Sequence, residues 1–251
     1  RTKHFEGIRV ACSICLAKVE AQPDGYAPRM TVLVAGGTGH LGTAVVRELL
    51  AGGYAITATW VVESEAERLA AEPVELVQAD LFDPEAVDKA VEATGDLEAV
   101  VNLVGGYAEG QRVHETDPEQ FDGLMKLNVK PGFLLARAAM PRLIERGGGA
   151  FVGVSARAAL RPFPGAAGYI ASKAAVLALI QALDAEYKRH GIRCNAILPS
   201  VIDTPPNRAA QPDADYSKWV RPDEIAKVVR FLVSDESGPI SGAAVPVYGR
   251  A

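Results

Sequence analysis

Short apolar runs alternate with helical patterns along the chain from Thr31 onward. The runs are apolar at almost every position, which is typical of parallel strands buried on both faces. The alternation predicts an α/β fold: one doubly wound parallel sheet with right-handed connections and helices on both faces. We expect strands at Thr31–Ala35, Ala55–Thr59, Val74–Gln78, Ala99–Val104, Ala150–Val154, Arg193–Leu198 and Ala244–Val247. We expect helices at Thr43–Leu50, Glu63–Ala71, Pro84–Ala93, Glu119–Met140, Ala167–His190 and Pro222–Leu232.

The length of 251 residues and the hydrophobic content of 49% suit one domain, which we place at residues 30–251. Residues 1–29 show no strand or helix pattern, and Pro23, Gly25 and Pro28 interrupt any element there, so we expect a flexible N-terminal extension. Cys12 and Cys15 form a C-x-x-C that no second cysteine pair or paired histidines complete, so we predict no metal site.

Charge, hydrophobicity and cysteine content limit the partners and the cellular location of the protein. The net charge is −5 and no basic stripe is visible, so we expect no nucleic-acid partner. No apolar run approaches the about 20 residues of a membrane span, so we expect no membrane partner. Three cysteines in a chain of this length favour a reducing compartment, and we predict a cytoplasmic location.

A glycine-rich turn separates the first expected strand from the first expected helix. Glycines allow the backbone to turn tightly and to approach a pyrophosphate, whose charge is stabilised at the helix N-terminus. The context of strand, turn and helix therefore predicts a dinucleotide-binding site. Its expected binding residues are Gly36, Thr38, Gly39, His40, Leu41 and Gly42.

The end of the second strand usually decides between NAD and NADP. An acidic residue there binds the ribose hydroxyls and favours NAD, but this chain has Trp60, with Glu63 three residues later. We find no arginine or lysine at this point to bind a 2′-phosphate either. The choice between NADP and NAD stays open, with a slight preference for NADP, and Trp60 itself is expected to pack on the sheet.

Polar residues and glycines follow the third and fourth expected strands. The carboxyl ends of strands in doubly wound folds are where ligands bind. Two other roles are open for Asp80: capping the helix that starts at Pro84, or lying in a turn. We predict that Asp80, Leu81, Asn102, Val104 and Gly105 line the adenosine side of the cofactor.

Tyr169 and Lys173 lie four residues apart and share one face of the expected helix Ala167–His190. A tyrosine normally titrates near about 10, and a nearby ammonium lowers its pKa. A phenol tuned in this way can protonate a carbonyl oxygen as a hydride reaches the carbon. We therefore predict that Tyr169 is the general acid/base and that Lys173 assists it.

These motifs resemble the short-chain dehydrogenase/reductase family, and the resemblance covers the chain from Met30 on. It implies a Rossmann-type fold, a catalytic Tyr169, and a Lys173 that also holds the nicotinamide ribose. It further implies that Asn128 orders a proton-relay water. Pro199, Ile202 and Thr204 are expected, on the same ground, to contact the nicotinamide amide, with Ser200 replacing the usual glycine of that segment.

The catalytic serine of the family is the main departure. It usually stands thirteen residues before the tyrosine, which is Ala156 here, while Ser155 stands one residue early. Ser155 is therefore a doubtful catalytic residue that either acts directly or only packs. The segments Val104–Gly110, Ala156–Leu160 and Leu198–Arg208 look like the dihydropteridine-reductase branch, which also lacks the serine.

The resulting hypothesis is an NAD(P)-dependent enzyme that moves a hydride between nicotinamide and a small carbonyl, alcohol or imine. The alternative is a non-catalytic dinucleotide-binding sensor. Pro205–Trp219 is expected to be a mobile lid over the substrate. We also expect a homodimer or homotetramer, because two helical segments carry small residues on more than one face. These residues are Ala136, Ala138, Ala139, Ala171, Ala174, Ala175, Ala178 and Ala182.

Overall fold

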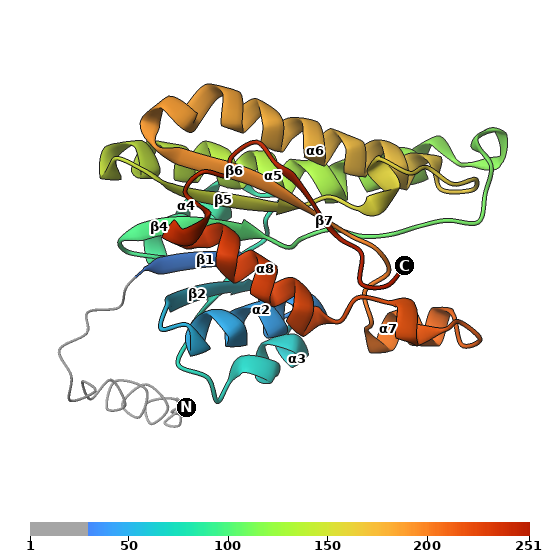
Figure 1. The fold of residues 1–251 in the computed structure, drawn as a ribbon, viewed down its shortest axis with the longest axis horizontal. Coiled ribbons are helices and arrows are strands. Elements are labelled where there is room, and N and C mark those ends of the chain that lie inside the picture. The colour runs from blue at the N-terminus through green and yellow to red at the C-terminus, as the bar shows by residue number, and fades with distance from the viewer. Residues whose placement is uncertain (1–29) are drawn as a thin grey trace, which may run out of the picture.

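The computed structural model describes residues 30–251, which build one seven-stranded sheet with helices on both faces (Figure 1). The strand order is β3-β2-β1-β4-β5-β6-β7, and all pairs are parallel. This confirms the predicted Rossmann-type fold. The strands are β1 (Thr31–Ala35), β2 (Ala55–Trp60), β3 (Glu75–Gln78), β4 (Leu97–Asn102), β5 (Gly149–Val154), β6 (Ile192–Pro199) and β7 (Ala244–Val247). The predicted extension 1–29, with Cys12 and Cys15, lies outside the described residues.

Two layers of helices cover the sheet (Figure 1). On one face Leu135 and Ile180 share an apolar cluster with Phe151 of β5, and on the other Leu49 and Val229 share one with Val152. The strand order runs outward from β1 in both directions, so a crevice opens between the carboxyl ends of β1 and β4. The helices are α2 (His40–Ala51), α3 (Glu63–Ala66), α4 (Pro84–Ala93), α5 (Pro118–Arg146), α6 (Ala167–Tyr187), α7 (Pro205–Ala210) and α8 (Pro222–Val233).

Three helices differ most from the sequence prediction. The helix expected at Glu63–Ala71 stops at Ala66 and continues as a single 3₁₀ turn, because α3 buries no residue against the sheet. Helix α5 is longer than Glu119–Met140: Asp117 caps its start, and it ends at the left-handed Gly147, with φ 89°. Helix α7 was not predicted at all, although Thr204 caps its first turn, which begins with two prolines.

The segment Ala167–His190 corrects the expectation that no apolar run approaches a membrane span. It is the one helical segment among residues 30–251 with the length and composition that a span requires, at a mean hydropathy of 1.2. One face of α6 packs on the sheet through Leu177 and Ile180. The opposite face is a row of exposed alanines, which raises the hydropathy further. These are Ala167, Ala171, Ala174, Ala178, Ala182 and Ala185, hereafter the alanine row.

Candidate active site

The structure brings the predicted site residues together at the carboxyl edge of the parallel sheet. They lie in the β1–α2 turn, at the ends of β2, β3, β4, β5 and β6, and on the facing parts of α5 and α6. In chain order they are Gly36, Thr38, Gly39, His40, Leu41, Gly42, Trp60, Asp80, Leu81, Asn102, Val104, Gly105, Asn128, Ser155, Tyr169, Lys173, Pro199, Ile202 and Thr204.

The glycine-rich turn fits a pyrophosphate. Gly36 has φ +74°, and a Cβ on Gly42 would lie 2.2 Å from the carbonyl oxygen of Gly36, so neither position accepts a side chain. Gly39 is the N-cap of α2 and provides no side-chain acceptor for the first-turn amides. Those N–H groups are available to an anion, which the positive end of the helix dipole also favours. The residues present therefore fit a dinucleotide.

Arg68 reaches this turn, and the sequence analysis missed it. Its Nη1 donates to the carbonyl oxygen of Thr38 at 2.8 Å and lies 3.2 Å from Glu65 Oε1. No arginine or lysine stands at Trp60 in the sequence, but the fold brings Arg68 to the glycine-rich turn. The chain folds back after α3 because Leu69 is fully buried, and that contact places Arg68 beside the turn. Trp60 is half-buried, and it joins neither of the two apolar clusters, so the structure does not support its expected packing role.

The residues after β3 form local hydrogen bonds. Asp80 accepts from the amide of Phe82 at 2.9 Å, which makes it a turn residue. The cap of α4 is Asp83, which accepts from the amide of Glu85 at 3.0 Å. Of the roles left open for Asp80, helix capping is therefore wrong, and the turn is what the structure shows.

Gly105 is the point where the end of β4 meets α5 and α6. A Cβ on Gly105 would lie 2.6 Å from Asn128 Oδ1 and 2.9 Å from Lys173 Nζ. Asn128 is almost fully buried; its amide nitrogen donates to Ser172 Oγ at 2.9 Å, and its Oδ1 accepts from the amide of Gly106 at 2.9 Å. The side chain of Asn128 thus holds the strand end, α5 and α6 in one arrangement around Lys173.

Lys173 and Tyr169 are both shifted in pKa by burial. Burial lowers the pKa of Lys173 to about 8, and its Nζ donates to the carbonyl oxygen of Val154 at 3.0 Å. Burial raises the pKa of Tyr169 to about 12. The net pKa of Tyr169 is therefore raised by burial, and not lowered as the sequence led us to expect. At neutral pH the phenol keeps its proton and the lysine keeps most of its charge.

Ser155 turns away from the phenol and toward the backbone of α6. Its hydroxyl donates to the carbonyl oxygen of Lys173 at 2.7 Å, and its side chain is 2% exposed. With the bond from Lys173 to Val154, this makes a reciprocal pair of hydrogen bonds, which we call the β5–α6 clasp. Ala156 is also buried. The geometry favours a packing role for Ser155.

Tyr107 is a second residue that the sequence analysis did not assign to the site. Its ring meets the ring of Tyr169 edge to face, with centroids 4.7 Å apart and an interplanar angle of 86°. The side chain remains 50% exposed. An aromatic residue directly after Gly105 and Gly106, in a loop that leaves the carboxyl end of β4, is the signal that could have identified it.

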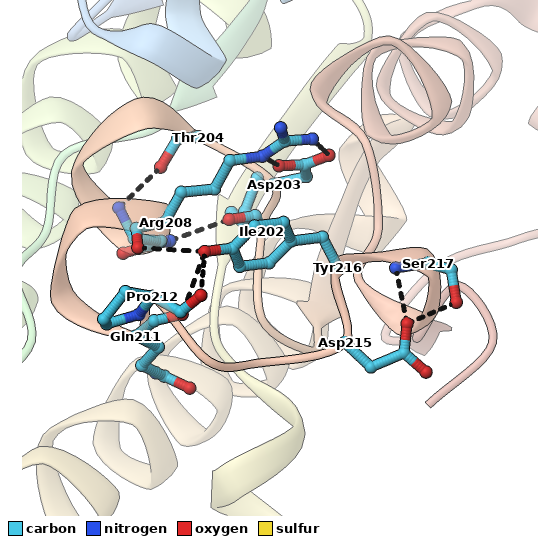
Figure 2. A network of polar contacts seen from close by, with 10 residues as sticks. Ile202, Asp203, Thr204, Arg208, Gln211, Pro212, Asp215, Tyr216 and Ser217 are labelled. Atoms are coloured by element: carbon cyan, nitrogen blue, oxygen red, sulfur yellow. Dashed lines mark hydrogen bonds and ion pairs between the residues drawn. The ribbon is translucent and has the colours of Figure 1, made fainter.

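The expected lid, Pro205–Trp219, is more ordered than an irregular loop. Asp203 pairs with Arg208, whose guanidinium lies 4.7 Å from the centroid of Tyr216 (Figure 2). The hydroxyl of Tyr216 is within hydrogen-bonding distance of three carbonyl oxygens, those of Arg208, Gln211 and Pro212. Ile202 bridges to Val220, and Thr204 accepts from the amide of Asn207. These contacts join α7 to the residues that follow it, so the segment has a defined structure of its own.

Among residues 30–251 no group of three or more histidine, cysteine, aspartate or glutamate side chains could hold a metal ion.

Residues 30–215 match the family model of the short chain dehydrogenases. The 2-(R)-hydroxypropyl-CoM dehydrogenase of Xanthobacter autotrophicus is 32% identical over 86% of this chain and 96% of its own length. The 4-formylbenzenesulfonate dehydrogenase of Comamonas testosteroni is 31% identical over 65% of this chain and 70% of its own.

Solved structures agree with these matches. A short chain dehydrogenase/reductase family protein superposes with a TM-score of 0.82 at 31% identity, covering 88% of this chain and 96% of the other. The 3-ketoacyl-(acyl-carrier-protein) reductase of Brucella melitensis, solved with NADH, gives a TM-score of 0.80 at 27% identity, covering 88% and 98%. The resemblance to the dihydropteridine-reductase branch stays a prediction. The chain belongs to the short-chain dehydrogenase/reductase family and is an NAD(P)-dependent oxidoreductase.

Proposed function

We propose that this protein reduces small planar carbonyl or imine compounds, or oxidises the corresponding alcohols, with Tyr169 as general acid/base. The observation that carries the proposal is the half-buried Tyr169, flanked by Lys173 on its own helix and by the half-exposed ring of Tyr107. Tyr107 offers an aromatic edge and face beside the reacting phenol. A flat substrate can lie against such a ring, since aromatic contacts are worth about 0.5–1.5 kcal/mol beyond the area they bury.

The residues of the site divide the chemical work. A nicotinamide dinucleotide, when bound at the glycine-rich turn, would supply or accept the hydride. Tyr169 donates its proton to the substrate oxygen or nitrogen during reduction, and the raised pKa keeps that proton available at neutral pH. The charge on Lys173 stabilises the phenolate that results. Asn128 is hydrogen-bonded both to Gly106, which follows β4, and to Ser172 on α6. These bonds fix the position of α6, which carries the proton donor Tyr169, relative to the loop after β4.

Loss of the usual serine narrows the substrate class. Ala156 has no hydroxyl and Ser155 Oγ is engaged with Lys173, so Tyr169 is the hydroxyl donor left for the developing negative charge. Loss of one such donor typically costs about 10²–10³ in rate. Activated or conjugated substrates, such as quinonoid imines, dicarbonyls and aryl aldehydes, need this help least. The name of the relative that acts on 4-formylbenzenesulfonate, an aromatic aldehyde, supports this class.

The test is consumption of NADPH and NADH across a panel of aryl aldehydes, dicarbonyls, quinonoid imines and simple ketones. We expect turnover of the conjugated members, with simple ketones at least tenfold slower. Binding of the dinucleotide without turnover of any panel member would support the alternative, a non-catalytic sensor. Faster turnover of simple ketones would contradict the substrate class.

We propose NADP(H) as the preferred cofactor, because Arg68 lies beside the glycine-rich turn and no acidic residue ends β2. A guanidinium can bind a phosphate through two charge-assisted hydrogen bonds. Arg68→Gln should therefore raise the Kd of NADPH about tenfold to a hundredfold and leave that of NADH unchanged. Calorimetry measures the Kd of each dinucleotide. Arg230→Gln is the control, because Arg230 lies on α8 and pairs with Glu48 of α2. A wild-type preference for NADH would contradict the proposal.

We also propose a homodimer or homotetramer built on α5 and α6. Of the predicted alanines, Ala136 and Ala139 face the core, whereas four belong to the exposed alanine row. Phe121 and Phe133 on the neighbouring α5 are 42% and 54% exposed. An exposed apolar face of this kind marks an interaction surface. Light scattering at micromolar concentration should give the mass of a dimer or tetramer. Ala174→Glu should reduce that mass to half or less. Ala51→Glu, on α2, is the control and should leave the mass unchanged. A monomeric wild type would refute this.

A cytoplasmic location is likewise proposed. It is supported by Cys194, which is buried and has a free thiol. Free thiols are typical of reducing compartments. Cell fractionation with an antibody against the protein would test it, and recovery from an oxidising compartment would contradict it.

A further inference from the structure

Two arginines of the loop after β5 share one aromatic ring. The guanidinium carbon of Arg157 lies 5.3 Å from the ring centroid of Tyr248, and that of Arg161 lies 5.9 Å away. Within residues 30–251 neither arginine forms an ion pair. By contrast, Arg208 and Arg221 each pair with a neighbouring aspartate. The ring of Tyr248 thus gathers two positive charges that no carboxylate neutralises.

The location of this pair is next to the catalytic side of the molecule. Arg157 follows Ser155 by two residues and is half-buried. The carbonyl oxygen of Tyr248 accepts a hydrogen bond from Ser200 Oγ at 2.7 Å, and Ser200 directly follows Pro199 at the end of β6. The arginines and their ring therefore connect the two segments that flank the site, the β5–α6 loop and the end of β6.

Two like charges on one ring repel each other, and the cation–π contacts offset only part of that repulsion. An anion between or beside the guanidinium groups would remove it. Guanidinium groups are planar and bind carboxylates or sulfonates through paired hydrogen bonds, which suits them to orient a substrate as well as to hold it. A site with this chemistry selects substrates by their charge.

We propose that Arg157 and Arg161, held on Tyr248, bind a carboxylate or sulfonate group of the substrate, so that the protein acts on planar carbonyl compounds that carry an anionic substituent. This inference rests on the proposed function for the reacting end of the substrate. It adds a second recognition point for the opposite end, made of residues that take no part in proton or hydride transfer.

The experiment compares 4-carboxybenzaldehyde with its neutral methyl ester. Wild-type protein should have about a hundredfold higher kcat/KM for the carboxylate, because each of the two arginines contributes about tenfold. Arg157→Gln and Arg161→Gln should each reduce that ratio about tenfold or more, and the double variant should abolish the preference, since a hydrogen bond to a charged group is worth about ten- to a hundredfold. Turnover of the ester should stay unchanged. Arg189→Gln, an exposed arginine in the turn after α6, is the matched control and should leave the ratio unchanged.

A binding measurement that needs no turnover separates the two proposals. Benzoate binding is followed by ligand-observed NMR for the wild type and the double variant, with benzyl alcohol as the neutral probe. Benzoate binding that the double variant loses supports the anion site even when neither aldehyde is reduced, an outcome that overturns only the proposed function. Turnover of both aldehydes with an unchanged ratio in the double variant overturns the anion site and leaves the proposed function intact. Equal binding of benzoate by both proteins also overturns the anion site.

Discussion

Tyr169→Phe should lower kcat by about a thousandfold or more on any substrate that the wild type turns over. General acid catalysis typically contributes about 10²–10⁴ in rate, and here no serine hydroxyl stands ready to replace the phenol. Phenylalanine keeps the ring that packs against Tyr107, so the loss reflects the proton and not the packing. Steady-state kinetics with saturating cofactor measure it. The Kd of NADPH, measured by fluorescence, should change by less than about threefold.

Ser155→Ala is the matched control for Tyr169→Phe. Its hydroxyl serves the backbone of α6, so its removal should cost less than about tenfold in kcat, which is about 1.4 kcal/mol of barrier. A thousandfold loss in Ser155→Ala would show that Ser155 is the catalytic serine after all. Retention of a tenth or more of the activity by Tyr169→Phe would exclude Tyr169 as the general acid.

Lys173→Met should lower kcat by about a hundredfold or more and should also remove one limb of the pH profile. Burial lowers the pKa of Lys173 to about 8, so the charged form exists below that pH and is lost above it. The wild-type reduction rate should therefore stay level up to about pH 7 and fall through pH 8, as the charge that stabilises the Tyr169 phenolate disappears. Methionine has similar length and no charge, so its residual rate should show no such fall.

A charged replacement distinguishes this electrostatic role from packing. Lys173→Arg keeps a positive charge at every accessible pH, and its residual activity should lack the fall near pH 8. A wild-type profile that is level to pH 9, or a Met variant that keeps the fall, would contradict the assignment of that limb to Lys173.

The sequence predicted the fold well because its strongest signals were local. Each strand was expected from a short apolar run, and six of the seven lie within one residue of the expected bounds at both ends; β4 begins and ends two residues early. The boundaries failed where tertiary packing decides the outcome. Helix α3 stops early because nothing on it is buried, and α7 forms because Thr204 caps a first turn that starts with Pro205.

The sequence predicted which residues lie at the strand ends that form the site, but it did not predict which of their side chains are in contact. Periodicity places Tyr169 and Lys173 on one helix face, yet it cannot show how much solvent each loses, and burial is what raises one pKa and lowers the other. Arg68 lies eight residues beyond Trp60 in the sequence and reaches the turn only because the chain folds back. Tyr107 meets Tyr169 across 62 positions of sequence, a pairing that no local pattern encodes.

The β5–α6 clasp has a consequence for how this enzyme can diversify. Lys173 holds the carbonyl of Val154, and Ser155 holds the carbonyl of Lys173, so the strand end and the helix are joined directly, without help from the intervening loop. Mutation can therefore rewrite that loop while the proton-transfer machinery stays in place. Substitutions in this loop can therefore change the substrate specificity of the enzyme while Tyr169 and Lys173 keep their positions.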